Sequence, residues 1–210
     1  MLTNQNILKI FDKFSKHYTR AQSALKSKNK FTFLVSVVLS AQSTDVSVNS
    51  ATKNLYKIVK TPEDMIKLGE KKLKKYIKTI GLYNSKAKNI LALSNKLLID
   101  FNSKIPSSFE GLISLPGVGN KTASVFQNEI LKIPRIAVDT HVFRVSNRLG
   151  LVKTKTADQT QLYLEQIIPK KWHMQAHNFL ILHGRRVCKS QKPLCEVCFI
   201  NKWCLFDKKN

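Results

Sequence analysis

The sequence is poor in acidic residues and in arginine. Only 13 Asp and Glu stand against 36 Lys and Arg in 210 residues, which gives a net charge of +23. A surplus of this size favours a polyanionic partner, and nucleic acid is the commonest one. Most of the basic residues are Lys, however, and a composition rich in Lys, Asn and Ile is also what an AT-rich genome produces. Charge therefore indicates nucleic acid only in combination with a motif.

Long apolar runs are also missing. The longest, FTFLVSVVL at residues 31–39, is too short for a bilayer, which needs about 20 residues. The N-terminal segment lacks the apolar block and the small-residue cleavage site of a secretory signal, and its apolar spacing is typical of an amphipathic helix. We therefore expect a soluble cytoplasmic protein with no membrane partner.

Cysteine is absent before Cys188, and all four cysteines then follow in one short segment, spaced Cys188-x6-Cys195-x2-Cys198-x5-Cys204. A disulfide framework would scatter its cysteines, whereas a tight group in a reducing cytosol is more often a metal site. Zinc and iron–sulfur clusters both accept four thiolates, but zinc sites usually carry two C-x2-C pairs. The single pair present here favours an iron–sulfur cluster and leaves zinc open.

Apolar residues recur at spacings of three and four through most of the chain, and neither sustained alternation nor an Asn-Gly turn predicts strands. Thr61 followed by Pro62 and two acids has the form of a helix N-terminus, while Gly69, Gly81 and Gly150 stand where helices should end. The predicted fold is all-α. Helices are expected over residues 4–18, 31–40, 45–58, 62–67, 70–78, 84–99, 108–114, 120–130, 139–149, 156–167 and 172–184.

The segment LPGVGNKTA, from Leu115 to Ala123, joins two of these predicted helices. Gly117 and Gly119 flank Val118, and glycine permits positive φ and close backbone approach. The free amides and the dipole at the start of the second helix form an anion site suited to a phosphate. Pro-Gly-Val-Gly alone is also compatible with a plain turn between helices.

Lys121 falls in the first turn of the helix after this hairpin, where a cation opposes the helix dipole. Helix propensity therefore does not explain the position of Lys121. A site that disfavours the ammonium favours the neutral amine, which is the form of lysine that acts as a nucleophile. Asp139 stands 18 residues later (139 − 121), directly before another predicted helix. An Asp there is an ordinary N-cap, and because a capped carboxylate is rigidly held, the structural and catalytic interpretations are compatible.

These two segments, LPGVGNKTA and the IAVDTHVFRV that contains Asp139, resemble the catalytic segment of the endonuclease III family. Three further stretches are similar to that family: LSAQSTDVSVN at 39–49, IKTIGLYNSKAKNI at 77–90 and LILHGRRVC at 180–188. The resemblance runs from about residue 31 to Cys204. It is specific because the segments occur in the family's order and spacing.

The resemblance implies a helix-hairpin-helix DNA glycosylase fold, in which two helical domains flank a DNA-binding groove. Residues 23–133 would form a helical barrel domain that contains the hairpin at about 109–130. Residues 1–22 and 134–210 would form the cluster domain. Lys121 and Asp139 would then face each other across the groove.

The activity implied is that of a bifunctional DNA glycosylase and AP lyase in base excision repair. The damaged base, an oxidised pyrimidine in the family, is flipped out of the duplex. Lys121 attacks the sugar with the help of Asp139, and β-elimination through a Schiff base cleaves the strand 3′ to the abasic site. His141 is expected to be structural.

The resemblance also assigns DNA-binding residues. Gln42 would fill the gap left by the flipped base and Leu82 would intercalate, although a polar helix-end residue and a core leucine are the ordinary alternatives. The predicted backbone contacts come from Leu115, Gly117, Val118, Gly119, Asn120, Lys189 and Lys192. Asn120 stands where many relatives carry Arg, which puts one phosphate contact in doubt. The spacing of Cys188, Cys195, Cys198 and Cys204 resembles that of the family's [4Fe–4S] ligands.

Two other functions remain open from the residues. A non-catalytic DNA-binding module with a structural metal would use the same hairpin and cysteines, and only the pair of Lys121 and Asp139 speaks against it. A monofunctional glycosylase acting on mispaired adenine lacks the lysine. The expected partner is damaged double-stranded DNA, bound by a monomer without a nucleotide cofactor in the bacterial cytoplasm, at the nucleoid.

Overall fold

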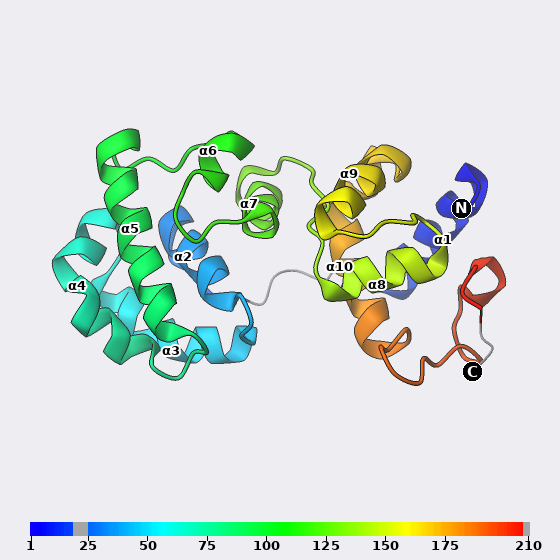
Figure 1. Ribbon diagram of the computed structural model, residues 1–210, viewed down its shortest axis with the longest axis horizontal. Helices are drawn as coiled ribbons and strands as arrows, with labels where there is room; N and C mark the ends of the chain where they lie inside the picture. The colour runs from blue at the N-terminus through cyan, green and yellow to red at the C-terminus, as the bar shows by residue number, and fades with distance from the viewer. Residues whose placement is uncertain (19–24, 208–210) are drawn as a thin grey trace. The chain divides into compact units, whose positions relative to one another are not determined.

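The computed structural model describes residues 1–18 and 25–207, and all regular elements within these ranges are helical (Figure 1). The prediction of an all-α fold is confirmed. The chain divides into two compact units, one of Met1–Gln22 with Lys132–Asn210 and one of Ser23–Leu131. The predicted boundary between residues 22 and 23 lies outside the described residues.

The unit Ser23–Leu131 is built around a helix buried on nearly every side. Its elements are α2 (Lys30–Ser40), α3 (Asp45–Ile58), α4 (Pro62–Ile77), α5 (Tyr83–Phe101), α6 (Phe109–Ile113), α7 (Asn120–Phe126) and the π-helical turn η1 (Gln127–Leu131). Every residue of α2 from Phe31 to Leu39 is buried. The longest apolar run of the sequence is therefore the central core helix of this unit.

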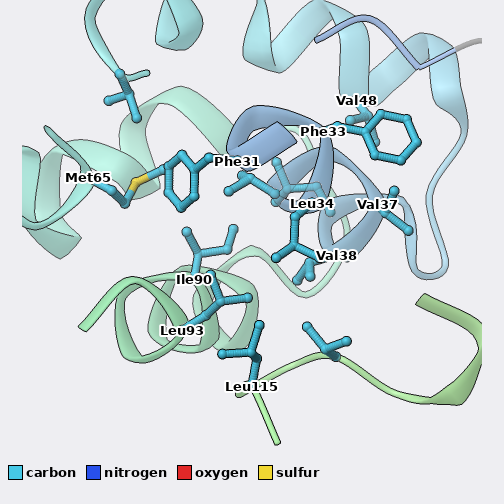
Figure 2. Close-up of a cluster of buried hydrophobic side chains, with 14 of the residues drawn as sticks. Phe31, Phe33, Leu34, Val37, Val38, Val48, Met65, Ile90, Leu93 and Leu115 are labelled. Atoms are coloured by element: carbon cyan, nitrogen blue, oxygen red, sulfur yellow. The ribbon is translucent and has the colours of Figure 1, made fainter. Parts of the chain in front are cut away.

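Figure 2 shows how side chains from several elements meet around α2. Phe31, Leu34 and Val38 of α2 pack in one core with Met65 of α4 and Ile90 of α5. Each fully buried side chain of this size contributes about 1.5–3 kcal/mol. The core thereby fixes the end of α2, the start of α5 and the segment after α6, beside which the predicted site residues of this unit lie.

Helix α4 contains the break predicted at Gly69, whose backbone is left-handed with φ 76°. The two helices expected over 62–67 and 70–78 thus form one kinked element. The cap predicted at Thr61 is also present. The Thr61 side chain accepts a hydrogen bond from the Asp64 amide, and the Asp64 carboxylate accepts from the Thr61 amide, which completes a capping box.

The second unit consists of α1 (Asn4–His17), α8 (Thr140–Leu149), α9 (Ala157–Ile167), α10 (Lys170–Arg186) and the short 3-10 turn η2 (Asn201–Trp203). Phe11 and Phe14 of α1 are fully buried and pack in one core with Val145 of α8 and Leu180 of α10. Helix α10 begins two residues earlier and ends two residues later than predicted.

The segment after the last cysteine returns to the end of α8. Gly150 terminates α8 in the left-handed conformation, as predicted, and a Cβ built on it would lie 2.6 Å from Leu205 Cδ1. The Leu205 amide donates to the Leu149 carbonyl at 3.3 Å. The C-terminal end of the cysteine-rich segment is therefore attached to the C-terminal end of α8. Within the described ranges, no helix has the length and apolar character needed to cross a membrane.

Candidate functional site

The hairpin between α6 and α7 is anchored from inside the unit. Leu115 and Val118 are both buried in the core, and the Val118 amide donates to the Leu115 carbonyl at 3.0 Å. Gly117 has φ 78°, and a Cβ there would lie 2.9 Å from Cβ of Asn89 on α5. Of the residues predicted to meet DNA here, Leu115 and Val118 thus offer only their backbone.

Gly119 differs from Gly117 because the fold itself does not require a glycine there. Its φ of −93° and ψ of 178° suit any residue, and a Cβ would meet nothing within 4 Å. It is the N-cap of α7 and provides no side chain to cap the first amides. Open space therefore adjoins a helix N-terminus, which is the arrangement that binds a phosphate. Lys121 is exposed in the first turn of the same helix.

Gln42 and Leu82 are both exposed and both have left-handed backbones, with φ of 54° and 59°. This conformation costs a residue with a Cβ roughly 1–2 kcal/mol. Leu82 is 61% exposed, so the alternative of a core leucine is excluded. The two turns are neighbours, since a Cβ on Gly81 would lie 3.7 Å from the Gln42 carbonyl oxygen. Strained, exposed residues of this kind concentrate at functional sites.

Asp139 is the N-cap of α8. Its Oδ1 accepts hydrogen bonds from the amides of His141 at 2.9 Å and Val142 at 2.8 Å, which confirms the predicted cap. Residues 136–138 before it are buried, and Asp139 itself is half-buried. His141 Nδ1 lies 3.1 Å from Nη2 of Arg144. Asp139 is therefore held rigidly at a partly open helix end, and Lys121 belongs to the other unit.

The four cysteines line one pocket together with His183 and Phe206. Burial raises the pKa of the Cys198 thiol, and so do the charges of the other three thiols. Such crowding of thiolates suits a positively charged iron centre. No three His, Cys, Asp or Glu side chains of the described ranges are arranged to hold a single metal ion. The pocket, with a thiol from each of four positions, fits the four-iron cluster that binds one thiolate per iron.

Two arginines of α8 hold the start of the cysteine loop. Arg144 Nη2 donates to the carbonyl oxygens of Gly184 at 2.9 Å and Cys188 at 3.0 Å. Arg148 Nη1 donates to the Lys189 carbonyl at 2.6 Å and lies 3.8 Å from the Cys188 thiol. The helix that presents Asp139 at its first turn thus also fixes this loop. Beyond it, Lys189 is exposed, as is Lys192, whose φ is 47°.

His183 of α10 contacts the pocket from the core side. Its Nε2 lies 3.6 Å from the Cys198 sulfur, and its Nδ1 lies 3.1 Å from the Tyr18 hydroxyl. Burial, together with the charge of His17, lowers the pKa of His183 to about 4. Sequence reasoning missed His183, Arg144 and Arg148. The only signal for Arg144 and His183 is that they stand near Asp139 or Cys188 in segments that resemble the family, and Arg148 follows the first of these segments by three residues.

Comparison with known proteins accords with this geometry. Residues 35–170 match the family described as HhH-GPD superfamily base excision DNA repair protein, and residues 188–204 match the iron-sulfur binding domain of endonuclease III. Endonuclease III of Rickettsia prowazekii is 54% identical over 93% of this chain and 92% of the relative. Endonuclease III of Escherichia coli K12 is 43% identical over 96% of both chains.

Solved structures agree with the sequence comparisons. A structure described as a trapped Endonuclease III–DNA covalent intermediate matches with a TM-score of 0.91 and 40% identity. The match covers 98% of this chain and 97% of the other. A non-covalent Endonuclease III–DNA complex matches with the same TM-score and identity. Because the similarity spans nearly the whole length in both comparisons, the chain belongs to the endonuclease III family of the HhH-GPD superfamily.

Proposed function

We propose that Lys121 is the nucleophile with which this DNA glycosylase and AP lyase removes damaged bases in base excision repair. The observation that carries the assignment is its position: an exposed amine in the first turn of α7, two residues beyond the open Gly119. A phosphate held by the hairpin backbone brings the DNA strand to this helix end. The likeness to a trapped covalent Endonuclease III–DNA intermediate supports a reaction in which the protein bonds covalently to DNA.

The reaction begins with the damaged nucleotide turned out of the duplex. The neutral Lys121 Nζ attacks C1′ of the sugar, and the bond from C1′ to the base breaks, so that the base leaves with the electron pair and takes up a proton. The sugar ring opens to give a Schiff base between Nζ and C1′. The Schiff base acidifies C2′, and loss of that proton expels the 3′ phosphate and cleaves the strand. Hydrolysis then frees Lys121.

Asp139 would assist the first step. Its Oδ1 is engaged by two backbone amides, while Oδ2 accepts no hydrogen bond from any residue in the described ranges. One oxygen of a rigidly held carboxylate thus remains to take a proton from the amine or to stabilise positive charge on the sugar. Gln42 would fill the space of the extruded nucleotide and Leu82 would enter the base stack beside it, since both are exposed and presented by adjacent turns.

The chain carries a [4Fe–4S] cluster site, and we assign Cys188, Cys195, Cys198 and Cys204 as its ligands. When bound, the cluster supplies a rigid cross-link among the four thiolates. Lys189 and Lys192 lie in the loop between the first two ligands, and we propose that they contact DNA phosphates. The unit Ser23–Leu131 is assigned as the helical barrel domain and the remainder as the cluster domain.

The protein binds DNA, and oxidised pyrimidines in duplex DNA are the proposed lesions. We further propose a monomer that uses no nucleotide cofactor and works in the bacterial cytoplasm, at the nucleoid. The relatives reported above are bacterial, which supports this location.

Borohydride trapping tests the nucleophile. The protein is mixed with a duplex that carries one abasic site or one thymine glycol, and borohydride reduces any Schiff base to a stable protein–DNA bond. We expect a covalent band with the wild type and with Lys53→Ala, which removes an exposed lysine of α3, and no band with Lys121→Ala. A band that survives Lys121→Ala would assign the chemistry to another amine. No band at all, with DNA binding retained, would favour a monofunctional glycosylase or a binding module.

A further inference from the structure

Lys86, near the start of α5, is a buried lysine with only 6% of its surface exposed. Its Nζ donates to the carbonyl oxygen of Leu39 at 2.9 Å and to the hydroxyl of Ser43 at 3.0 Å. Burial lowers the pKa of Lys86, and none of the ion pairs among the described residues includes it. Burying an ammonium without a carboxylate partner is unfavourable, so the two hydrogen-bond acceptors of Lys86 indicate what the buried charge does in this fold.

Those acceptors lie at the C-terminal end of α2. The last four carbonyl groups of a helix have no partner within the helix. Here Val37 accepts from the Ser40 hydroxyl, Val38 from the Ala41 amide and Ser40 from the Ser43 amide. The remaining carbonyl, that of Leu39, accepts from Lys86. A cation at this end also interacts favourably with the helix dipole. Lys86 thus completes the C-terminal cap of α2 from a different helix.

The capped segment is the turn that presents Gln42. Leu39 and Ser43, the two residues that Lys86 holds, stand on either side of Gln42. Lys86 itself belongs to the helix that begins at the second turn, because its amide makes the first helical hydrogen bond of α5, to the carbonyl of the N-cap Leu82 at 3.0 Å. The Lys86 side chain therefore ties the turn of Gln42 to the first turn of the helix that Leu82 caps, and the backbones of the two left-handed turns also approach each other at Gly81.

We propose that Lys86 is a positioning residue for base extrusion: it fixes the turns of Gln42 and Leu82 to each other so that both side chains enter the duplex together. The inference rests on the insertion roles proposed above for these two residues. Lys86 itself does not contact DNA in this arrangement, because its ammonium is directed into the protein. Its effect is confined to the steps that require an opened duplex.

The test compares Lys86→Met, which keeps the apolar stem and removes both hydrogen bonds, with Lys88→Met, which removes an exposed positive charge from the same helix. Two substrates separate extrusion from chemistry. A duplex with thymine glycol requires the base pair to open, whereas borohydride trapping on a single-stranded abasic oligonucleotide requires the reaction at Lys121 but no opening of a base pair. Each variant is also made in a Gln42→Ala/Leu82→Ala background.

We expect Lys86→Met to slow single-turnover excision from the duplex at least about tenfold, since a displacement of 1 Å at a catalytic site can cost about 100-fold. Trapping on the single strand should stay within about twofold of wild type, and Lys88→Met should behave as wild type on both substrates. In the Gln42→Ala/Leu82→Ala background, Lys86→Met should add little further loss, because its effect passes through those residues.

Equal losses on both substrates, or a full additional loss in the double-alanine background, would overturn the proposal. The insertion roles are judged separately, since they fail if Gln42→Ala/Leu82→Ala alone excises at the wild-type rate. Should Lys86→Met fail to fold, Ser43→Ala removes one of the two hydrogen bonds from the other side. It should show a smaller loss of the same kind on the duplex alone, and wild-type excision by this variant would count against the proposal.

Discussion

The two hairpin glycines should respond in opposite ways to alanine. Gly117 has φ 78°, and a Cβ there would lie 2.9 Å from Cβ of Asn89 and 3.3 Å from its Nδ2. The left-handed conformation destabilises an alanine by roughly 1–2 kcal/mol, and the close contact with Asn89 adds to this loss. The reduced conformational freedom of the unfolded chain stabilises the variant by only about 0.4–1 kcal/mol. Gly117→Ala should therefore lose about 1–2 kcal/mol, which for a chain of this size lowers Tm by roughly 3–6 °C.

Gly119→Ala should leave stability almost unchanged. Its backbone is extended and its Cβ would lie in open space, so no strain arises. Alanine is a poorer N-cap than glycine, but the unfolded-state effect of about 0.4–1 kcal/mol acts in the other direction. The methyl group would instead stand where a phosphate must approach the first amides of α7. Loss of one charge-assisted hydrogen bond, about 1.5–3 kcal/mol, corresponds to at least tenfold weaker DNA binding.

Thermal unfolding followed by circular dichroism gives the stability of both variants, and fluorescence anisotropy with a labelled abasic duplex gives their affinity. The affinity of Gly119→Ala is compared at a temperature where both variants are folded. The reasoning would be refuted if Gly119→Ala lost as much stability as Gly117→Ala. It would equally be refuted if Gly119→Ala bound DNA as tightly as wild type, because the open space at Gly119 would then not be a phosphate site.

Three further predictions concern charged residues. Asp139→Asn keeps a good N-cap, so Tm should change by only a few degrees. The rate of single-turnover excision should nevertheless fall by about 10²–10⁴-fold, because the carboxylate is lost. A fall in Tm large enough to leave the variant unfolded in the assay would contradict this prediction. Arg148→Met removes the bond to the Lys189 carbonyl and the contact with the Cys188 thiol, and visible absorption of the cluster should decay faster in air than in wild type. An unchanged rate of decay would show that the cysteine loop protects the cluster without help from Arg148. The backbone amide of Lys60 lowers the pKa of Asp64 from its ordinary value of 3.8. The Asp64 carboxylate therefore stabilises the fold fully above pH 3.8, and this contribution is lost as pH falls through the lower, folded-state pKa. The difference in Tm between wild type and Asp64→Asn should accordingly become smaller below pH 3.8.

The sequence predicts helices well where local signals and packing agree. Thr61 with Pro62 and Asp64 satisfies a cap through residues only three apart, and Gly69 breaks the helix that follows because it adopts positive φ. Asp139 belongs to the same class, since its two partners are the next amides along the chain. The ends of α10 were harder to predict, because the cap chemistry at Pro169 and Val187 includes no side-chain hydrogen bond.

Features that depend on tertiary contacts cannot be read from spacing. The two glycines of the hairpin look alike in sequence. In the structure Gly117 has a positive φ and lies against Asn89, whereas Gly119 is extended and has nothing beside it. Leu82 has an apolar side chain of the kind that is usually buried. It is exposed because it lies in a left-handed turn, a backbone conformation that sequence rules do not predict for leucine. For these positions the resemblance to a family supplied the hypothesis, and the structure supplies a physical reason to test it.

Lysine illustrates the difference most clearly, because 30 lysines (36 Lys and Arg minus six Arg) make any single one inconspicuous in this sequence. Lys121 is distinguished by a motif, since it follows two glycines at a helix start. Lys86 is distinguished only by its environment: it is buried, and its ammonium caps the Leu39 carbonyl at the end of α2 from a different helix. Replacing an exposed lysine such as Lys88 changes the charge that attracts DNA, whereas replacing Lys86 changes where two side chains stand. In a protein this basic, burial rather than charge is therefore the property that separates a positioning lysine from the general electrostatic surface.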